Sequence, residues 1–531
     1  MSLLEAKVWR KSVLLQVMKS KGLYGTLLAL TMVILVLPVV QQHTRWFRLK
    51  PLHGVTVATA QPELSVGSFM SGDYQQQEEQ YLAENLGFRE LLVRCYNQFS
   101  WSLFHLPQNK RVVAGSDGWL FSDILTRHHD GQLVYDYGNS NEEVVRHMRT
   151  SANLLYQLQE VLREQGVSFF VCLPPSKDRV CEAYMDQRER VYERPSGVAA
   201  IDFFPPLFDS LGINYLNLSE YFMQIRDTVS YPLYLKSSFH WSQQSACYVA
   251  DTLVRYMEAL SGLHMHSLNY SEPYLAKTRQ PDADLEELMN LLWPVGSNEN
   301  YYVDVTVDAD TTAVRPRWLV VGDSYYWLWQ YGLPLEQMFD SHHYWYYNNT
   351  VFNDTLHSHV DEVDIIRELL TTDVVMLLYS PTNLFDLNRG FLTNALLAFY
   401  YEDGVVDAKV EQIKREIKNS PEWFASIEQQ ALAEGKDVES ALEGNARYML
   451  RNNPSLYFDE LKGAEVPACR SSRVAKVRSD LQDSIRESRR RQIYGNPEWM
   501  NSIREKANNK GVPLDIAIEQ DVDWMLRGEG R

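Results

Sequence analysis

The feature that most constrains this chain is an uncharged apolar run close to its N-terminus. Residues 23–40 contain no Asp, Glu, Lys or Arg, and these 18 residues just reach the length of helix that spans a bilayer. The stretch before them carries five basic residues and one acidic residue, which favours a cytoplasmic N-terminus. We therefore expect residues 1–22 in the cytoplasm, a transmembrane helix over 23–40, and the remaining chain outside.

A cleaved signal peptide is the rival interpretation of this run. Its apolar core would be shorter, and a small-residue cleavage site would follow directly. The tripeptide Ala58-Thr59-Ala60 has suitable residues but lies far downstream. An uncleaved anchor is therefore favoured, followed by a juxtamembrane linker over residues 41–65.

Beyond the linker, apolar strand patterns alternate with amphipathic helical patterns as far as about Tyr401. Continuous apolar runs over 167–173, 318–322 and 373–379 are typical of strands buried on both faces, and residues 144–165 and 242–260 have helical periodicity. Strands that alternate with helices predict a parallel sheet covered on both sides. The expected fold over residues 66–402 is a three-layer α/β/α domain.

The last 120 residues follow a different pattern, with an internal repeat at an offset of 76 positions. Pro421-Glu422-Trp423 recurs as Pro497-Glu498-Trp499, and Met449-Leu450-Arg451 recurs as Met525-Leu526-Arg527. Each copy, about 415–451 and 491–527, has Pro near a helix start and a Gly stop between two helices. Residues 410–531 are therefore predicted to form an all-α tail of two helical repeats, a packing or docking module.

Charge and cysteine usage exclude some classes of function. The net charge is −18, which argues against nucleic acid as the main partner because phosphate binding needs a basic surface. The five cysteines show no zinc-ligand spacing. Cys172 and Cys181 bracket a short loop, and either a disulfide between them or five unpaired structural thiols fits the sequence.

Two segments could carry chemistry. Ser324 follows an apolar strand within Gly322-Asp323-Ser324, at the strand end where α/β folds place their sites, and the next helix would offer N–H groups to an oxyanion. His240 precedes a helical stretch, a placement that suits a general base for a serine elsewhere. Each segment alone also fits an ordinary structural role.

Several segments in this order resemble the SGNH-hydrolase-like alginate O-acetyltransferases and the related DHHW proteins. The segments that carry the resemblance are Tyr81-Leu-Ala-Glu-Asn-Leu-Gly-Phe-Arg89, Gly115-Ser-Asp-Gly-Trp-Leu-Phe121, Leu173-Pro-Pro-Ser-Lys-Asp-Arg179, Ser238-Phe-His-Trp241 and Gly322-Asp-Ser324. The resemblance covers roughly residues 66–400 and implies an SGNH-like fold, with Ser324 as nucleophile and His240 as general base.

One departure from the family's pattern concerns the acid that should support His240. The family has a carboxylate two residues before its histidine, where this chain has Ser238. Such a carboxylate orients the imidazole and stabilises its charged form. Three alternatives remain open: another acid such as Asp202, Asp209 or Asp178 reaches His240, a Ser–His dyad suffices, or the domain is a non-catalytic relative.

Other residues of these motifs have two interpretations each. Asp323 is expected to hold the turn rather than to act as the missing acid. Lys177 either meets an anionic polymer or is a solvated loop charge. Trp241 directly follows His240, as the tryptophan follows the histidine in the family's motif. The aromatic residues after the nucleophile either stack on sugar rings or pack their own helix; these residues are Tyr325, Tyr326 and Trp327.

The resulting hypothesis is an O-acetyltransferase that modifies an exported or cell-surface polysaccharide through a serine acetyl ester. The resemblance implies a bacterial inner-membrane protein with one span, a periplasmic catalytic domain and a multispanning MBOAT-type partner as acetyl donor. No cofactor and no metal are implied. The alternatives are a catalytically inactive carbohydrate-binding or assembly protein, and a carbohydrate acetylesterase.

Overall fold

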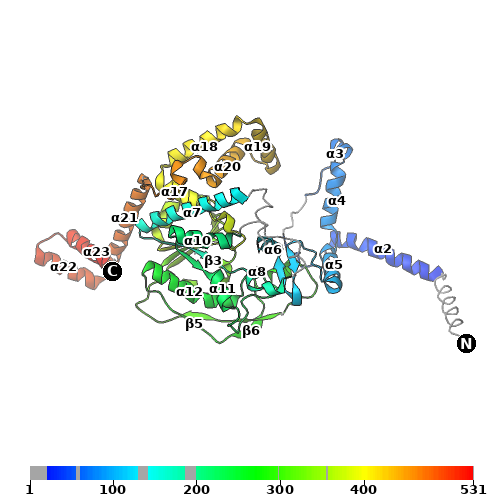
Figure 1. Cartoon of the computed structure of the whole chain (residues 1–531), viewed down its shortest axis with the longest axis horizontal. Helices are drawn as coiled ribbons and strands as arrows, with labels where there is room; N and C mark the ends of the chain where they lie inside the picture. Colours follow the sequence, from blue (N-terminus) through cyan, green and yellow to red (C-terminus); the bar gives the residue numbers. More distant parts are fainter. Residues whose placement is uncertain are drawn as a thin grey trace.

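The computed structural model describes residues 21–54, 60–129, 141–185, 199–296, 298–353, 357–469 and 471–529. The predicted cytoplasmic segment lies almost entirely outside them. The first described element is helix α2 (Lys21–Thr44), which extends away from the body of the molecule (Figure 1). Within the described residues, α2 is the one helix long and apolar enough to cross a membrane, over Tyr24–Thr44 with a mean hydropathy of 2.0. The helix continues four residues past the predicted end at Val40.

A seven-stranded sheet forms the centre of the body, in the order β12-β11-β10-β9-β13-β3-β4. Its strands are β3 (Ser168–Leu173), β4 (Tyr215–Asn217), β9 (Arg317–Gly322), β10 (Ser341–Tyr346), β11 (Thr350–Phe352), β12 (His357–His359) and β13 (Val374–Leu378). Five strands are mutually parallel, and β11 and β12 add antiparallel at one edge. The predicted parallel sheet is therefore mixed, because β11 runs antiparallel to β10 and β12 runs antiparallel to β11.

Alternate residues of the central strands enter two separate hydrophobic cores. Val375 and Leu377 of β13 pack on one face, and Val374, Met376 and Leu378 pack on the other. Helices α7 (Asn141–Glu164), α10 (Ala200–Leu211) and α17 (Phe391–Tyr400) cover the first face. Helices α11 (Leu218–Ile225), α12 (Gln243–Ser261) and α14 (Tyr326–Gly332) cover the second. This arrangement confirms the predicted three-layer α/β/α domain.

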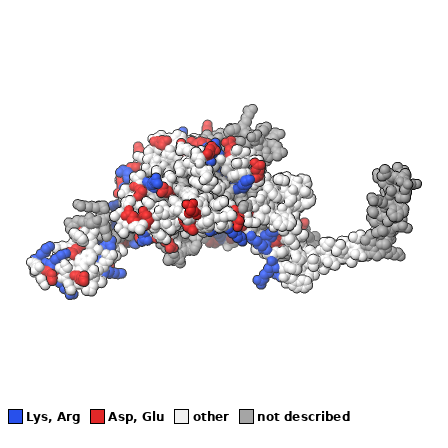
Figure 2. Space-filling view, turned by 90° about the horizontal axis from the view of Figure 1, so that it is seen from below, with Lys and Arg blue, Asp and Glu red and all other residues white. Residues whose placement is uncertain are grey.

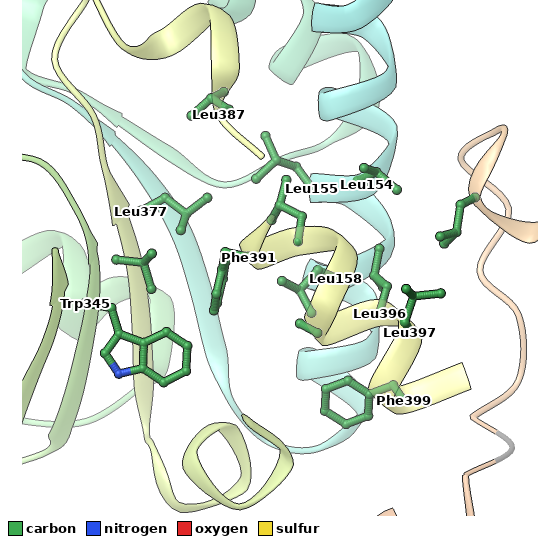
Figure 3. Close-up of a cluster of buried hydrophobic side chains, with 14 of the residues drawn as sticks. Leu154, Leu155, Leu158, Trp345, Leu377, Leu387, Phe391, Leu396, Leu397 and Phe399 are labelled. Carbon is green, nitrogen blue, oxygen red and sulfur yellow. The ribbon is translucent and has the colours of Figure 1, made fainter. Parts of the chain in front are cut away.

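In the first core, apolar side chains of the central strand β13 pack against apolar side chains of the covering helices. Leu154, Leu155 and Leu158 of α7 lie beside Phe391 of α17 and Leu377 of β13 (Figure 3). All five side chains are at most 1% exposed. Strands buried on both faces have no polar side to alternate with, which is why their sequences read as continuous apolar runs.

Further short elements surround this frame. The hairpin β1 (Val112–Ala114) with β2 (Leu120–Ser122), the pair β5 (Leu268–Tyr270) with β8 (Val305–Val307), and the pair β6 (Tyr274–Lys277) with β7 (Glu299–Tyr302) are all antiparallel. The short helices are α6 (Asp123–His129), α8 (Lys177–Val180), α13 (Asp284–Leu288), α15 (Leu335–Met338) and α16 (Ile365–Thr371). Of these, α8 and α13 contribute directly to the candidate site.

Three helices connect the N-terminal arm to the body: α3 (Val66–Ser71), α4 (Asp73–Asn85) and α5 (Arg89–Phe104). The predicted linker, of which residues 55–59 lie outside the described part, is partly attached to the body. The Arg94 guanidinium of α5 donates to the carbonyl oxygens of Lys50 and Pro51 at 2.8 Å each, and the His53 N–H donates to Asn290 Oδ1 at 2.7 Å. The linker therefore runs along the domain.

Each copy of the tail repeat lies in a set of three helices. The first set is α18 (Asp403–Lys418), α19 (Pro421–Glu434) and α20 (Val438–Asn452), and the second is α21 (Ser472–Gly495), α22 (Pro497–Lys510) and α23 (Leu514–Glu529). Gly435 and Gly511 end α19 and α22 with φ of 65° and 62°. Ile427 packs into the core of the α/β domain, whereas its repeat equivalent Ile503 packs into a small separate cluster. The first copy therefore belongs to the body, and the second stands apart from it (Figure 1).

The described cysteines are all unpaired. Cys172, Cys181 and Cys247 are buried, and Cys95 and Cys469 are exposed. A disulfide between Cys172 and Cys181, which was one of the two alternatives, is therefore absent from these residues. Burial raises the pKa of the Cys181 thiol to about 12, so this thiol stays protonated at neutral pH.

Candidate active site

Ser324 lies just beyond the carboxyl end of β9, between β10 and β13 at the centre of the sheet. Gly322 lets the chain leave the strand tightly, because a Cβ at this position would lie 2.2 Å from the carbonyl oxygen of Leu378. The Asp323 N–H then donates to that same carbonyl at 2.9 Å. The turn places the Ser324 hydroxyl at the sheet edge where ligands bind in open α/β folds.

His240 comes from the loop that precedes α12, on the second face of the sheet. Ser242 caps α12, with its hydroxyl accepting from the Ser245 N–H at 3.1 Å, so the histidine sits just before a fixed helix start. His240 is 7% exposed. Its Nε2 lies 2.8 Å from Ser324 Oγ, across 84 residues of sequence. The two predicted candidates are therefore in direct hydrogen-bond contact.

The carboxylate beside His240 is Asp284, which the sequence analysis did not single out. Its Oδ2 lies 2.7 Å from His240 Nδ1, although 44 residues separate the two. Its Oδ1 accepts from the N–H groups of Phe239 and Leu285 at 2.7 and 2.8 Å. With the Nδ1 proton donated to Asp284, Nε2 is left to accept the proton of the Ser324 hydroxyl.

Backbone contacts join the histidine loop to the turn that carries Asp284. The carbonyl of Ser237 accepts from the N–H groups of Leu285 and Glu286 at 3.1 and 3.2 Å. The Ser237 hydroxyl donates to the carbonyl of Asp282 at 3.1 Å. These contacts hold the start of α13 against the loop, so that an acid distant in sequence occupies the place expected of a residue beside the histidine.

Ser238 supports the same loop through hydrogen bonds to backbone groups. Its hydroxyl accepts from the His240 N–H at 3.0 Å and donates to the carbonyl of Pro281 at 3.3 Å. The acids that the sequence offered as substitutes have other partners. Asp202 pairs with Arg179 at 2.5 Å, Asp209 accepts from Tyr215 Oη at 3.0 Å, and Asp178 accepts from Ser176 Oγ.

The burial of Lys177 contradicts both interpretations of this residue. The residue is 0% exposed, so it neither meets a polymer nor lies in solvent. Its Nζ donates to the carbonyls of Leu120, Leu235 and Lys236 at 2.7, 2.8 and 3.1 Å, and to that of Ser238 at 2.5 Å. Burial lowers the pKa of Lys177 to about 7, whereas these carbonyls favour the charged form. Lys177 thus ties three of the sequence motifs together beneath the histidine loop.

The aromatic residues after Ser324 belong mostly to the hydrophobic core. Tyr325 and Tyr326 are each 0% exposed, so in this structure neither presents a ring face to a sugar, which corrects that expectation. Tyr325 lies against His240 with ring centroids 5.1 Å apart, and against Trp241 at 5.4 Å. Trp241 is itself fully buried. Trp327 is partly exposed and packs on neighbouring rings.

Asp323 holds the turn around Ser324, as expected. Its Oδ1 accepts from the Tyr325 N–H at 3.2 Å, and its Oδ2 accepts from the Ser380 N–H at 2.7 Å. The N–H groups of Tyr326 and Trp327 donate to the carbonyls of Asp323 and Ser324 at 3.3 and 3.2 Å. The expected oxyanion donors at the start of α14 are therefore already engaged in this conformation.

Among the described residues, no group of three or more His, Cys, Asp and Glu side chains is arranged to hold a metal ion. The site presents instead a hydroxyl, an imidazole and a carboxylate in one hydrogen-bonded line. Such a line can activate a serine for attack on an ester carbonyl. The fold and this arrangement define a serine hydrolase-like α/β domain.

Residues 112–339 match the family model of the SGNH hydrolase-like domain of the acetyltransferase AlgX. This match confirms the resemblance noted from the motifs, and residues 112–339 are similar to an SGNH hydrolase-like acetyltransferase domain. The matched region contains Ser324, His240 and Asp284.

Comparisons with individual proteins give weaker likenesses. No curated protein sequence matches the chain. The O-acetyltransferase domain of Pseudomonas putida AlgJ is 18% identical, over 52% of this chain and 92% of that chain, with a TM-score of 0.36. Pseudomonas aeruginosa AlgX is 12% identical, over 55% and 70%, with a TM-score of 0.36. Bacillus cereus PatB1 is 15% identical, over 45% and 91%, with a TM-score of 0.31.

Proposed function

We propose that the chain is a membrane-anchored O-acetyltransferase that acetylates an exported or cell-surface polysaccharide through an acetyl ester on Ser324. The observation that carries the proposal is the hydrogen-bonded line from Ser324 through His240 to Asp284. The match of residues 112–339 to an acetyltransferase domain supports acetyl transfer over other serine chemistry. The resemblance of the sequence motifs to alginate O-acetyltransferases suggests a polysaccharide acceptor.

In the first half-reaction, Ser324 Oγ attacks the carbonyl carbon of an acetyl donor as His240 Nε2 takes the hydroxyl proton. The tetrahedral adduct collapses, the donor's leaving group takes that proton, and acetyl-Ser324 remains. In the second, His240 takes the proton of a sugar hydroxyl, which attacks the ester carbonyl carbon, and the imidazolium returns that proton to Ser324 Oγ as the ester bond to Ser324 breaks. Asp284 stabilises the imidazolium formed in both halves.

The apolar helix α2 and the family match support a proposed location. We place the domain on the periplasmic side of the bacterial inner membrane, held there by α2 as a single span. Acetyl-CoA stays in the cytoplasm, so the domain needs a membrane partner that delivers acetyl groups, and an MBOAT-type protein fits this role. Neither nucleic acid nor a cofactor has a part in the proposed chemistry.

Transfer and hydrolysis differ only in whether a sugar or water accepts the acetyl group. The full chain in detergent, supplied with a chromogenic acetyl ester and soluble uronate or glucan oligosaccharides, should yield acetylated sugar, and Ser324→Ala should yield none. Mass spectrometry of the sugars and an assay of free acetate separate the outcomes. Acetate without acetylated sugar would identify an acetylesterase, and turnover no greater than that of Ser324→Ala would favour a binding protein.

A further inference from the structure

Helix α5 has an exposed apolar face that nothing in the described structure covers. Leu92, Tyr96, Phe99 and Leu103 are 50%, 61%, 57% and 61% exposed. Their spacing of four, three and four residues places them on one side of a helix with 3.6 residues per turn. From Cys95 to Leu106 the sequence has no Asp, Glu, Lys or Arg, so no charged side chain interrupts this stripe.

The stripe points away from the body, because the opposite side of α5 makes the contacts with it. Asn97 Nδ2 donates to the carbonyl of Met289 at 2.7 Å, and Gln98 Oε1 accepts from the Trp293 N–H at 3.1 Å. Arg94 holds the linker from the same side. On a helical wheel these three residues lie between about a third and half a turn from the stripe. The stripe is thus an outward surface of an otherwise anchored helix.

The beginning of α5 lies at the level of the last turns of α2. Gly87, two residues before α5, packs so closely there that a Cβ would lie 2.0 Å from the carbonyl of Pro38 and 2.7 Å from the N of Gln42. Phe88 and Phe47 are in contact, with ring centroids 6.0 Å apart. From this junction α5 runs across the end of α2 rather than continuing it (Figure 1). If α2 spans a bilayer, an element in this position follows the membrane surface.

The charge around the junction is opposite to that of the whole chain. Residues 41–54 contain Arg45, Arg48 and Lys50 and no acidic residue, in a protein of net charge −18. All three basic side chains are exposed, as are Trp46 and Phe47 at 70% and 62%. Figure 2 shows Lys and Arg side chains gathered where the N-terminal arm joins the body. Basic and aromatic residues at one level suit anionic headgroups.

We infer that α5 is an interfacial helix whose apolar stripe inserts into the outer surface of an anionic lipid bilayer. The inference rests on the proposed spanning role of α2 and adds a second membrane contact to it. Its consequence is orientation: α5 holds residues 289–293, which directly follow the helix α13 that begins at Asp284. Insertion of the stripe would thus fix the distance of the candidate active site from the membrane and its orientation relative to the membrane.

The native cysteines provide a test with the full chain. Cys95 is exposed on α5, one helical turn from Leu92 and Phe99, and Cys469 is exposed in the tail. An environment-sensitive thiol fluorophore is attached to Cys95 in a Cys469→Ser variant, and to Cys469 in a Cys95→Ser variant as matched control. Both proteins are reconstituted into vesicles of phosphatidylethanolamine and phosphatidylglycerol, with and without lipids that carry a nitroxide quencher near the headgroup.

The Cys95 probe should shift to shorter wavelength and be quenched at least twofold, while the Cys469 probe should do neither. Tyr96→Asp with Phe99→Asp should abolish the Cys95 response, whereas Tyr448→Asp, an exposed tail site, should preserve it. Alkaline extraction of the vesicles shows whether α2 anchors the protein. If the protein stays in the vesicles and the two probes respond equally, the inference is overturned and the α2 anchor stands. Release of the protein by that extraction would instead overturn the anchor, and the inference with it.

Discussion

Asp284→Asn should lower the turnover of an acetyl ester by about ten-thousandfold. The estimate is the effect of the same change in a serine protease, where an amide in place of the carboxylate holds the histidine in the wrong tautomer. Here Asp284 Oδ2 contacts His240 Nδ1 at 2.7 Å. An asparagine amide facing Nδ1 would donate a proton there and leave Nε2 protonated, unable to accept from Ser324. Steady-state kinetics with a chromogenic acetyl ester measure the change.

Asp202→Asn is the matched control for this prediction, because Asp202 pairs with Arg179 at a surface position. Its turnover should stay within about twofold of the parent. Ser238→Asp should bring no large gain, since Asp284 already occupies the position beside Nδ1. A loss below tenfold in Asp284→Asn, or a strong gain in Ser238→Asp, would mean that Asp284 does not support His240 in the reaction.

Lys177→Met should destabilise the domain by at least about 3 kcal/mol. The change removes a buried donor and leaves four carbonyl oxygens, including those of Leu120 and Ser238, without it. A hydrogen bond to a charged group contributes about 1.5–3 kcal/mol, and a buried acceptor left unpaired adds a desolvation penalty. Urea unfolding followed by tryptophan fluorescence measures the change in the free energy of unfolding.

Lys236→Met is the control, because Lys236 is exposed and its Nζ donates to the carbonyl of Asp117 at 2.7 Å. It should lower the free energy of unfolding by less than about 1 kcal/mol. Similar losses in the two variants would show that the buried ammonium does not organise the motifs around it. We also expect reduced turnover in Lys177→Met at temperatures where it stays folded, since the loop of Ser238 and His240 loses its support.

The frame of the domain could be predicted from sequence because its strands are buried on both faces. The apolar runs predicted over 167–173, 318–322 and 373–379 correspond to β3, β9 and β13, and the predicted helices correspond to α7 and α12. The antiparallel edge was missed, because β11 and β12 have three residues each and lack a distinct pattern. The repeat offset was visible because both copies keep the same buried positions, such as Ile427 and Ile503.

The site was only half predictable for a physical reason. Ser324 and His240 stand in local motifs, whereas Asp284 reaches His240 only because backbone contacts fold its turn against the histidine loop. Its surroundings, Asp282, Glu286 and Glu287, gave no means to choose one acid. The burial of Lys177 was equally hidden, since a lysine in a loop motif is usually solvated.

Covalent labelling of Ser324 tests the central proposal most directly. The full chain is incubated with an acetyl ester, quenched in acid and measured by intact mass, and the modified peptide is then sequenced. We expect one added acetyl group, located on Ser324, in the parent protein and none in Ser324→Ala or His240→Ala. An adduct that persists in Ser324→Ala, or a folded parent protein that turns over the ester without an adduct on Ser324 even under rapid quenching, would contradict the serine mechanism.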